Sequence, residues 1–448
     1  MTNIVVFGKA HAGKSTLIGY ILSLKNGISY SEKKLQSELG NDYDPSYYYA
    51  YQLDDSMKER NEKITKNIHI RNALLPNEQR VKLIDTPGRE HLKREKEKGT
   101  FYGDIGIFCL EINDVASENF LANDKERSAV ISALMLWSSF AHKRIIVALT
   151  KSDMCNYSEE IFKNAEVKIR DLCNKAALET IIVIPIAIIV EERTGHNIDK
   201  KSEKLCWYLG QSLIDVMDSE IQEATNDFRD RELLFCVDRQ VSLPQSHVGK
   251  IWRIKIIQGK LSVGDTIILS PVLTADNKDF ISVETKVKTI REDSHITEEK
   301  SEIPFVSAGS IVGLDLCDMY FDGRRIQKKD FNALYTTCGF NSNVKFITSN
   351  RFKFSISSEH SQKFVRGRQF TLIWFGRGQN FSVLDNCKSE DKMNSIITAI
   401  LTVRKIALPI DSNGEYYFTS LLIRDENIKE DKKYYEAELI SLLQEKLS

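Results

Sequence analysis

The sequence predicts an α/β domain with a mainly parallel sheet, followed by two all-β domains built as small barrels. Up to about residue 220, short apolar runs rich in β-branched residues alternate with helical stripes. That alternation is typical of strands buried on both faces beneath covering helices. After about residue 228, β-branched runs are separated by glycine turns and no helical stripe appears, which is typical of small barrels.

The first domain is expected to span 1–225. Two apolar stripes, at 129–140 and 161–173, have the periodicity of helices that cover a sheet. Five largely apolar runs are its expected strands: Asn3–Phe7, Val81–Ile84, Ile105–Leu110, Arg144–Leu149 and Ile181–Ile186.

Glycine-containing turns place the two β-domains. Turns at 263–265 and 308–310 lie inside the first, which we expect over 229–325. Further glycines divide a second β segment over 340–425. The remaining segment, 426–448, is charged and carries Leu439, Leu442, Leu443 and Leu447. Their spacing predicts a C-terminal amphipathic helix.

Composition excludes several classes of protein. The 448 residues carry 62 Lys and Arg against 63 Asp and Glu, a net charge of −1, so the surface as a whole is not built to coat DNA or an anionic membrane. The eight cysteines form no C-x-x-C pair, which fits reduced thiols in a reducing compartment. The longest apolar run, Ile181–Val190, has ten residues, and a membrane span needs about 20. We expect a cytoplasmic protein.

The first chemical motif directly follows the first expected strand. Residues 8–15 read G-K-A-H-A-G-K-S and fit G-x-x-x-x-G-K-[ST], and a helical pattern follows. In this motif backbone N–H groups surround the β-phosphate of a nucleotide, Lys14 reaches the β- and γ-oxygens, and the Ser15 hydroxyl ligates Mg²⁺. The candidate nucleotide-binding residues are Gly8, His11, Ala12, Gly13, Lys14, Ser15 and Thr16.

Two more motifs follow later strands in the order that a guanine-nucleotide site needs. Asp85-Thr86-Pro87-Gly88 ends the second run, where Asp85 can hold the Mg²⁺ shell and the Gly88 N–H can bind a γ-phosphate. Thr150-Lys151-Ser152-Asp153 ends the fourth run. A carboxylate at Asp153 can accept the N1–H and 2-amino hydrogens of guanine, which adenine lacks, so GTP is favoured over ATP.

With these motifs, the sequence resembles the translational GTPases, most closely the elongation factor 1-alpha and Tu family, including the sulfate adenylyltransferase GTPase subunit. Residues 48–54, Y-Y-A-Y-Q-L-D, resemble the family's F-x-Y-A-W-V-L-D, and residues 58–65, K-E-R-N-E-K-I-T, resemble K-x-E-R-E-R-G-I-T. The resemblance implies that Thr65 completes the Mg²⁺ site and senses the γ-phosphate. It continues through Gly259–Asp265 and Gly309–Gly313, and is looser beyond about residue 320.

The resemblance also shows departures. Lys9, His11 and Ala12 replace polar residues of the family's G-H-V-D-H-G-K loop. Arg89 stands at the position where the family has a His that orients the attacking water, and His91 follows two residues later. We therefore expect slow or differently triggered hydrolysis, with Lys14, Arg89 and His91 as catalytic candidates.

The base-binding end departs from the family as well. Thr150 replaces the Asn of N-K-x-D, and Ala187-Ile188 align with the S-A/G that backs guanine. We therefore expect nucleotide affinity to be weaker than in the family.

The resemblance implies an α/β P-loop GTPase domain followed by two all-β barrel domains, with GTP or GDP and Mg²⁺ as cofactors. It implies a switch in translation that binds the ribosome and tRNA, or a release or rescue factor. Two alternatives remain open: a GTPase subunit that drives a catalytic partner in a metabolic complex such as sulfate adenylyltransferase, and a regulatory GTPase diverged from translation. The segment 341–380 carries seven basic residues, one acidic residue and interleaved aromatics, which indicates either RNA contact or strand alternation.

Overall fold

The computed structural model describes most of the chain. The described residues are 2–25, 27, 30–54, 56–89, 92–122, 124–138, 144–176, 178–226, 232–242, 250–274, 280–292, 302–326, 331–332, 338–342, 345–374, 377–388, 394–402, 406–410, 420–425 and 434–443. The chain divides into two compact units, Met1–Thr225 and Asn226–Ser448. Among the described residues, no helix is both long enough and apolar enough to cross a membrane.

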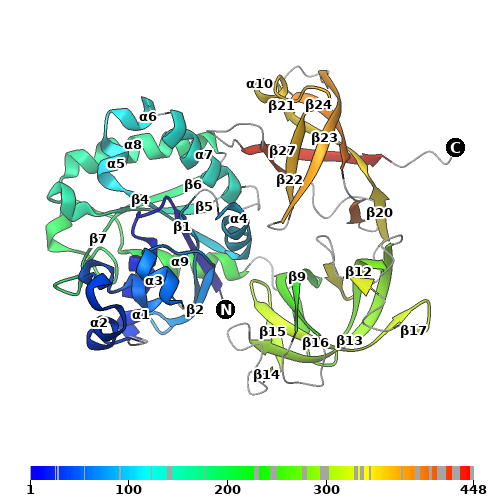
Figure 1. The fold of residues 1–448 in the computed structure, drawn as a ribbon, viewed down its shortest axis with the longest axis horizontal. Helices are drawn as coiled ribbons and strands as arrows, with labels where there is room; N and C mark the ends of the chain where they lie inside the picture. The colour runs from blue at the N-terminus through cyan, green and yellow to red at the C-terminus, as the bar shows by residue number, and fades with distance from the viewer. Residues whose placement is uncertain are drawn as a thin grey trace. The chain divides into compact units, whose positions relative to one another are not determined.

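A six-stranded sheet forms the centre of the first unit (Figure 1). Its strands run in the order β2-β3-β1-β4-β5-β6, parallel except for the edge strand β2. The five apolar runs predicted as strands are confirmed, whereas β2 is an addition. The bounds are β1 Thr2–Gly8, β2 His69–Leu74, β3 Arg80–Asp85, β4 Ile105–Glu111, β5 Arg144–Thr150 and β6 Thr180–Pro185.

Helices flank this sheet (Figure 1). Both predicted stripes are helical where the structure describes them, and residues 139 and 140 of the first stripe lie outside the described residues. In α8 the residues Phe162, Ala165, Ile169 and Leu172 are buried, because a 3.6-residue period brings them to one face. The bounds are α1 Lys14–Lys25, α2 Glu32–Leu39, α3 Met57–Glu62, α4 Lys93–Tyr102, α5 Ile112–Ala116, α6 Asn119–Ala122, α7 Asp124–Ser138, α8 Glu159–Lys175 and α9 Leu213–Asn226. A short hairpin, β7 Ala187–Ile189 with β8 Thr194–His196, follows β6.

The second unit begins with an antiparallel β-domain. Its pairings form a ring: β13 pairs with β12, β12 with β19, β19 with β9, β9 with β10, β10 with β16, and β16 again with β13. The ring strands are β9 Leu234–Ser242, β10 Lys250–Gln258, β12 Thr266–Thr274, β13 Phe280–Glu292, β16 Ile311–Phe321 and β19 Cys338–Phe340. Smaller strands are β11 Lys260–Ser262, β14 Glu302–Ile303, β15 Phe305–Ser307, β17 Arg324–Ile326 and β18 Phe331–Asn332. Because β19 completes the ring, this domain extends beyond the expected end at residue 325.

A closed six-stranded barrel, β21-β24-β23-β22-β26-β27, forms the last domain. Phenylalanines from several strands fill its interior, among them Phe352, Phe354, Phe370 and Phe381. The strands are β21 Arg351–Ser357, β22 Gln369–Trp374, β23 Arg377–Lys388, β24 Asn394–Leu401, β26 Ser420–Asp425 and β27 Tyr434–Leu443. β20 Lys345–Ser349 pairs with β25 Ile406–Ile410, and α10 spans Ser358–Ser361. An α/β domain followed by two β-barrel domains is the predicted fold class, which is confirmed.

The predicted C-terminal helix is wrong. Tyr434–Leu443 is strand β27, which pairs with β21 and β26 and closes the barrel. Leu439 and Leu442 have helical spacing, yet both are buried, because a register shift at exposed Ile440 moves the alternation of the strand by one residue. Residues 426–433 and 444–448, including Leu447, lie outside the described residues.

The basic segment 341–380 follows strand alternation. Phe352, Phe364 and Phe370 are fully buried in the barrel, so these rings are unavailable to stack on RNA bases. Arg351 and Arg366 are exposed. Alternation therefore explains the interleaved pattern, and it leaves basic side chains on the barrel surface.

Candidate functional site

The phosphate loop lies between the end of β1 and the start of α1. Gly13 has φ = +77°, and His11, which is exposed, has φ = +63°. These left-handed conformations turn the loop tightly before the helix. Lys14 is buried, and its Nζ donates to the Lys9 carbonyl at 2.7 Å. Burial lowers the pKa of Lys14, while the nearby Asp85 carboxylate opposes this shift. Gly8, Ala12 and half-buried Thr16 complete the predicted loop.

The two hydroxyl groups and the one carboxylate predicted for the Mg²⁺ site lie next to one another. The Ser15 Oγ donates to Asp85 Oδ2 at 2.6 Å and lies 3.1 Å from Thr65 Oγ1, and Thr65 Oγ1 lies 3.4 Å from Asp85 Oδ2. They come from the first turn of α1, the loop between α3 and β2, and the end of β3. Three distant segments thus supply oxygen ligands of the kind that Mg²⁺ prefers.

The surroundings of the Asp85 carboxylate show whether a cation would fit between these three side chains. Asp85 is fully buried, and its second oxygen, Oδ1, has no hydrogen-bond partner among the described residues. Burial raises the pKa of this carboxyl group, and Lys14 opposes the rise. An unsatisfied buried oxygen is costly in an otherwise bonded site. The hydration shell of a bound Mg²⁺ would satisfy it, so the residues present fit the ion.

Gly88 lies directly against the phosphate loop. A Cβ at this position would be 2.6 Å from the Ala10 Cα and 2.7 Å from the Lys14 Nζ, so only glycine allows this approach. The Gly88 backbone is therefore beside the ammonium group that would hold the β- and γ-phosphates. Arg89 is exposed. His91, the other water-positioning candidate, lies outside the described residues.

The base-binding motif is connected to the phosphate loop. The Thr150 Oγ1 lies 3.2 Å from the Ala12 carbonyl and 3.1 Å from the Leu110 carbonyl, so this hydroxyl joins β5, β4 and the loop. Lys151 has φ = +59°, and its Nζ pairs with Glu111. Asp153 is half-buried at the start of a short 3-10 helix, Ser152–Cys155.

A second base-side segment comes from β6 and β7. The Ser152 N–H donates to the Ile186 carbonyl at 3.1 Å, which joins the two predicted base-binding segments. Ala187 is buried and half-buried Ile188 follows it in β7. Asn197 Nδ2 donates to the Pro185 carbonyl at 3.2 Å and supports this turn.

Two residues of this region were not predicted. Glu111 binds Lys151, and Asp114 binds Lys9 of the phosphate loop at 3.4 Å. Glu111 is the polar residue that follows the apolar run Ile105–Leu110. A polar residue at the carboxyl end of a parallel strand is a signal for a ligand-binding edge, and that signal identifies Glu111.

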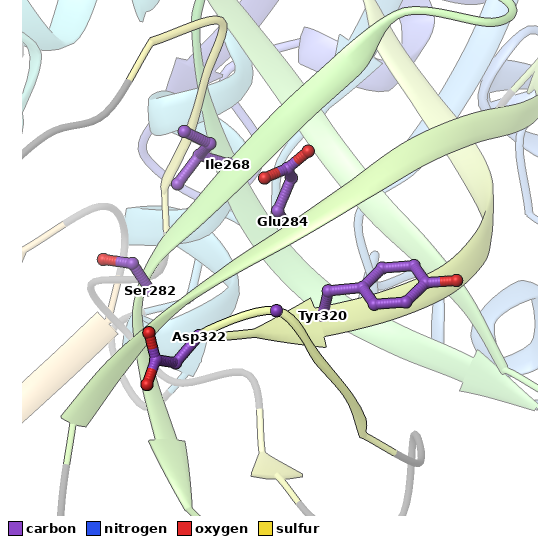
Figure 2. Close-up of a pocket in the computed structure, with 6 residues that line it drawn as sticks. Ile268, Ser282, Glu284, Tyr320 and Asp322 are labelled. Carbon is purple, nitrogen blue, oxygen red and sulfur yellow. The ribbon is translucent and has the colours of Figure 1, made fainter.

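A pocket of about 350 Å³ lies on the first β-domain, away from these motifs in the chain (Figure 2). Ile268 of β12, Ser282 and Glu284 of β13 and Tyr320 of β16 line it, together with the turn at Asp322 and Gly323. Glu284, Tyr320 and Asp322 are exposed. The pocket contains none of the predicted site residues.

Sequence comparison identifies the family. The model of the elongation factor Tu GTP binding domain matches residues 1–324. Elongation factor 1-alpha of Pyrococcus horikoshii is 27% identical over 288 residues, which cover 64% of this chain and 62% of the relative. That of Pyrococcus furiosus is 28% identical over 303 residues, which cover 66% and 64%. The chain thus spans a little under two thirds of the length of these relatives.

Solved structures agree on the fold. The GTPase-like domain of Saccharomyces cerevisiae Ski7 bound to GTP has a TM-score of 0.72 at 16% identity, covering 98% of this chain and 96% of that one. Elongation factor SelB of Methanococcus maripaludis with a GTP analogue has a TM-score of 0.62 at 15% identity, covering 99% and 79%. The family match covers well over half of the chain. The chain therefore belongs to the elongation factor Tu GTP-binding domain family.

Proposed function

We propose that this protein binds GTP with Mg²⁺ and acts as a two-state switch in translation. The convergence of Ser15, Thr65 and Asp85 carries the proposal, because three oxygen groups from distant segments meet beside the phosphate loop, where Mg²⁺ could bind all three. GTP would order this loop, and hydrolysis would release it. The bound Mg²⁺ would neutralise charge on the β- and γ-phosphates.

Different residues of the chain would bind different parts of the nucleotide. Lys14 would bind the β- and γ-phosphate oxygens, and the Gly88 N–H would bind the γ-phosphate. Asp153 would select guanine, with Lys151 packed over the base and Ala187 and Ile188 behind it. Thr150 would brace the base-binding strand against the loop at Ala12. GDP would occupy the same site after hydrolysis.

Hydrolysis is proposed to be slow without a partner. Arg89 stands where the family has its water-orienting His, and a guanidinium is a poor base at neutral pH. Arg89 can instead stabilise developing charge on the phosphoryl group, and His91 is the second candidate to orient water. A partner that repositions either side chain would then set the rate.

Family membership supports a ribosomal setting in the cytoplasm. The proposed partners are the ribosome with tRNA, or with a release or rescue factor. The relatives and structures reported above include translation elongation factors, which do not favour a metabolic-complex subunit.

GTP turnover with and without ribosomes tests this function. Stimulation of hydrolysis by at least about tenfold on adding ribosomes supports it, with a Lys14→Ala protein as the catalytic blank. GTP binding with turnover that ribosomes leave unchanged would contradict the role in translation. Absence of GTP binding would contradict the switch itself.

A further inference from the structure

A buried cluster of Asp54, Glu59 and His69 lies outside the residues assigned to the nucleotide. Asp54 precedes α3, Glu59 is inside α3, and His69 begins β2. The three are 4%, 2% and 4% exposed. Each offers one ligand atom, and these atoms all lie within 4.8 Å of one another. One imidazole and two carboxylates, withdrawn from water, are donors that a metal centre can use.

Glu59 and His69 are already oriented toward the centre of the cluster. The Lys66 and Asn67 N–H groups donate to Glu59 Oε1 at 2.8 and 3.2 Å, and the Ser56 hydroxyl donates to Oε2 at 3.1 Å. The His69 Nε2 lies 3.3 Å from the same Oε1. Outer hydrogen bonds of this kind hold metal ligands in position.

Asp54 is the third member of the cluster. Its backbone carbonyl accepts from the Arg60 Nε and Nη2 at 3.2 and 2.9 Å, which fixes the residue. Its carboxylate forms no hydrogen bond with the residues that the structure describes, although the side chain is buried beside Glu59 and His69. A buried carboxylate that forms no hydrogen bond is stabilised by a nearby compensating charge.

We propose that Asp54, Glu59 and His69 bind a divalent transition-metal ion of the Zn²⁺ class. Two carboxylates and a neutral imidazole would form an uncharged complex with such an ion, which suits a buried position. The imidazole favours Zn²⁺ over Mg²⁺ or Ca²⁺, which prefer oxygen ligands. Ligand bonds of about 2.0–2.2 Å need these side chains to close by only a small movement.

The cluster brackets Thr65 in the sequence. Asp54 and Glu59 precede it and His69 follows it, so the ion would tie together both ends of the loop that carries the Thr65 hydroxyl. His69 is also paired with Asp85 across β2 and β3. Metal binding would therefore hold Thr65 near Ser15 before the nucleotide arrives. This consequence rests on the proposed function, whereas the metal site does not.

The nucleotide-free protein is first treated with a chelator and then titrated with Co²⁺ to test the site. The visible absorption of bound Co²⁺ reports ligation, and Zn²⁺ should displace it. We expect one equivalent to be lost, or weakened at least tenfold, in His69→Ala and in the nearly isosteric Asp54→Asn. Glu62→Gln, which alters an exposed carboxylate of the same helix, is the matched control and should bind as the wild type does.

The outcomes separate the two proposals. Thermal unfolding of each variant shows that it is folded, and Zn²⁺ should raise the melting temperature of the wild type but not of Asp54→Asn. Equal Co²⁺ binding by wild type, His69→Ala and Asp54→Asn, or none by the wild type, would overturn the metal site. Because Co²⁺ is added without nucleotide, either result leaves GTP binding to be judged by its own measurement.

Discussion

The phosphate-binding end and the base-binding end of the candidate site differ in how much of the family pattern they keep. At the phosphate end, Ser15, Thr65 and Asp85 are all present and lie within hydrogen-bonding distance. At the base end, Thr150 stands in place of the family's Asn and Ala187 in place of its Ser, and Asp153 is the residue proposed to discriminate between bases. Charge and metal chemistry leave little choice of residue at the first end. Contacts at the second end are expected to be individually weaker, so we expect their loss to lower the affinity for nucleotide without abolishing binding.

Removal of the Lys14 ammonium group is the change with the largest expected effect. We expect Lys14→Ala to weaken GTP binding by about 100-fold or more, because a charge-assisted contact to phosphate is lost from a buried position. Isothermal titration calorimetry measures the affinity. Lys25→Ala at the exposed end of the same helix should change it little. Affinity within about threefold of the wild type in Lys14→Ala would show that the phosphates bind elsewhere.

Asp153→Asn should affect the base end selectively. The amide cannot accept both hydrogens that guanine presents, so we expect GTP affinity to fall by about 10-fold to 50-fold while ATP affinity stays unchanged. Competition between the two nucleotides for one fluorescent analogue measures both. Glu160→Gln, an exposed change nearby in the chain, is the control. A parallel loss of GTP and ATP binding would mean that Asp153 supports the fold instead.

Arg89→His restores the residue type that the family uses to orient water. We expect single-turnover GTP hydrolysis to rise by about tenfold, with GTP affinity unchanged, because Arg89 is exposed and is not one of the residues proposed to bind phosphate. Arg89→Ala should change the rate by less than about twofold. A large loss in Arg89→Ala would show that the guanidinium already stabilises phosphoryl charge.

Ala187→Ser is the change with the smallest expected effect. One added hydroxyl at the base end should raise GTP affinity by about twofold to fivefold, measured against ATP in the same assay. A fall in affinity would mean that the buried Ala187 position is too tightly packed to accept an oxygen.

Much of the fold followed from the sequence because local pattern and global position agree in the first domain. Runs such as Ile105–Leu110 are apolar throughout because both faces of the sheet are covered. The C-terminal segment shows where this fails. Its leucines have helical spacing, but strand pairing with β21 and a bulge at Ile440 decide the outcome. Tertiary pairing of this kind leaves no local signal in the sequence.

The candidate site was predictable to the extent that its motifs are contiguous. Lys14 and Asp153 come after strands and Asp85 ends one, so all three could be identified from spacing. Thr65 could be placed only by resemblance, since nothing in its neighbours identifies a ligand. The partnership of Asp54 and His69 was not predicted, because a loop and a helix separate them in the chain and only folding brings them together.

Equilibrium binding of GTP and ATP to the wild-type protein, each with and without Mg²⁺, tests the central claim most directly. The site described here predicts binding that prefers GTP over ATP by at least tenfold and weakens when Mg²⁺ is removed. For the Ser15→Ala protein, removing Mg²⁺ should change the GTP affinity only a little, because one ligand of the ion is missing. Equal affinity for the two nucleotides, or no binding of GTP, would contradict the account.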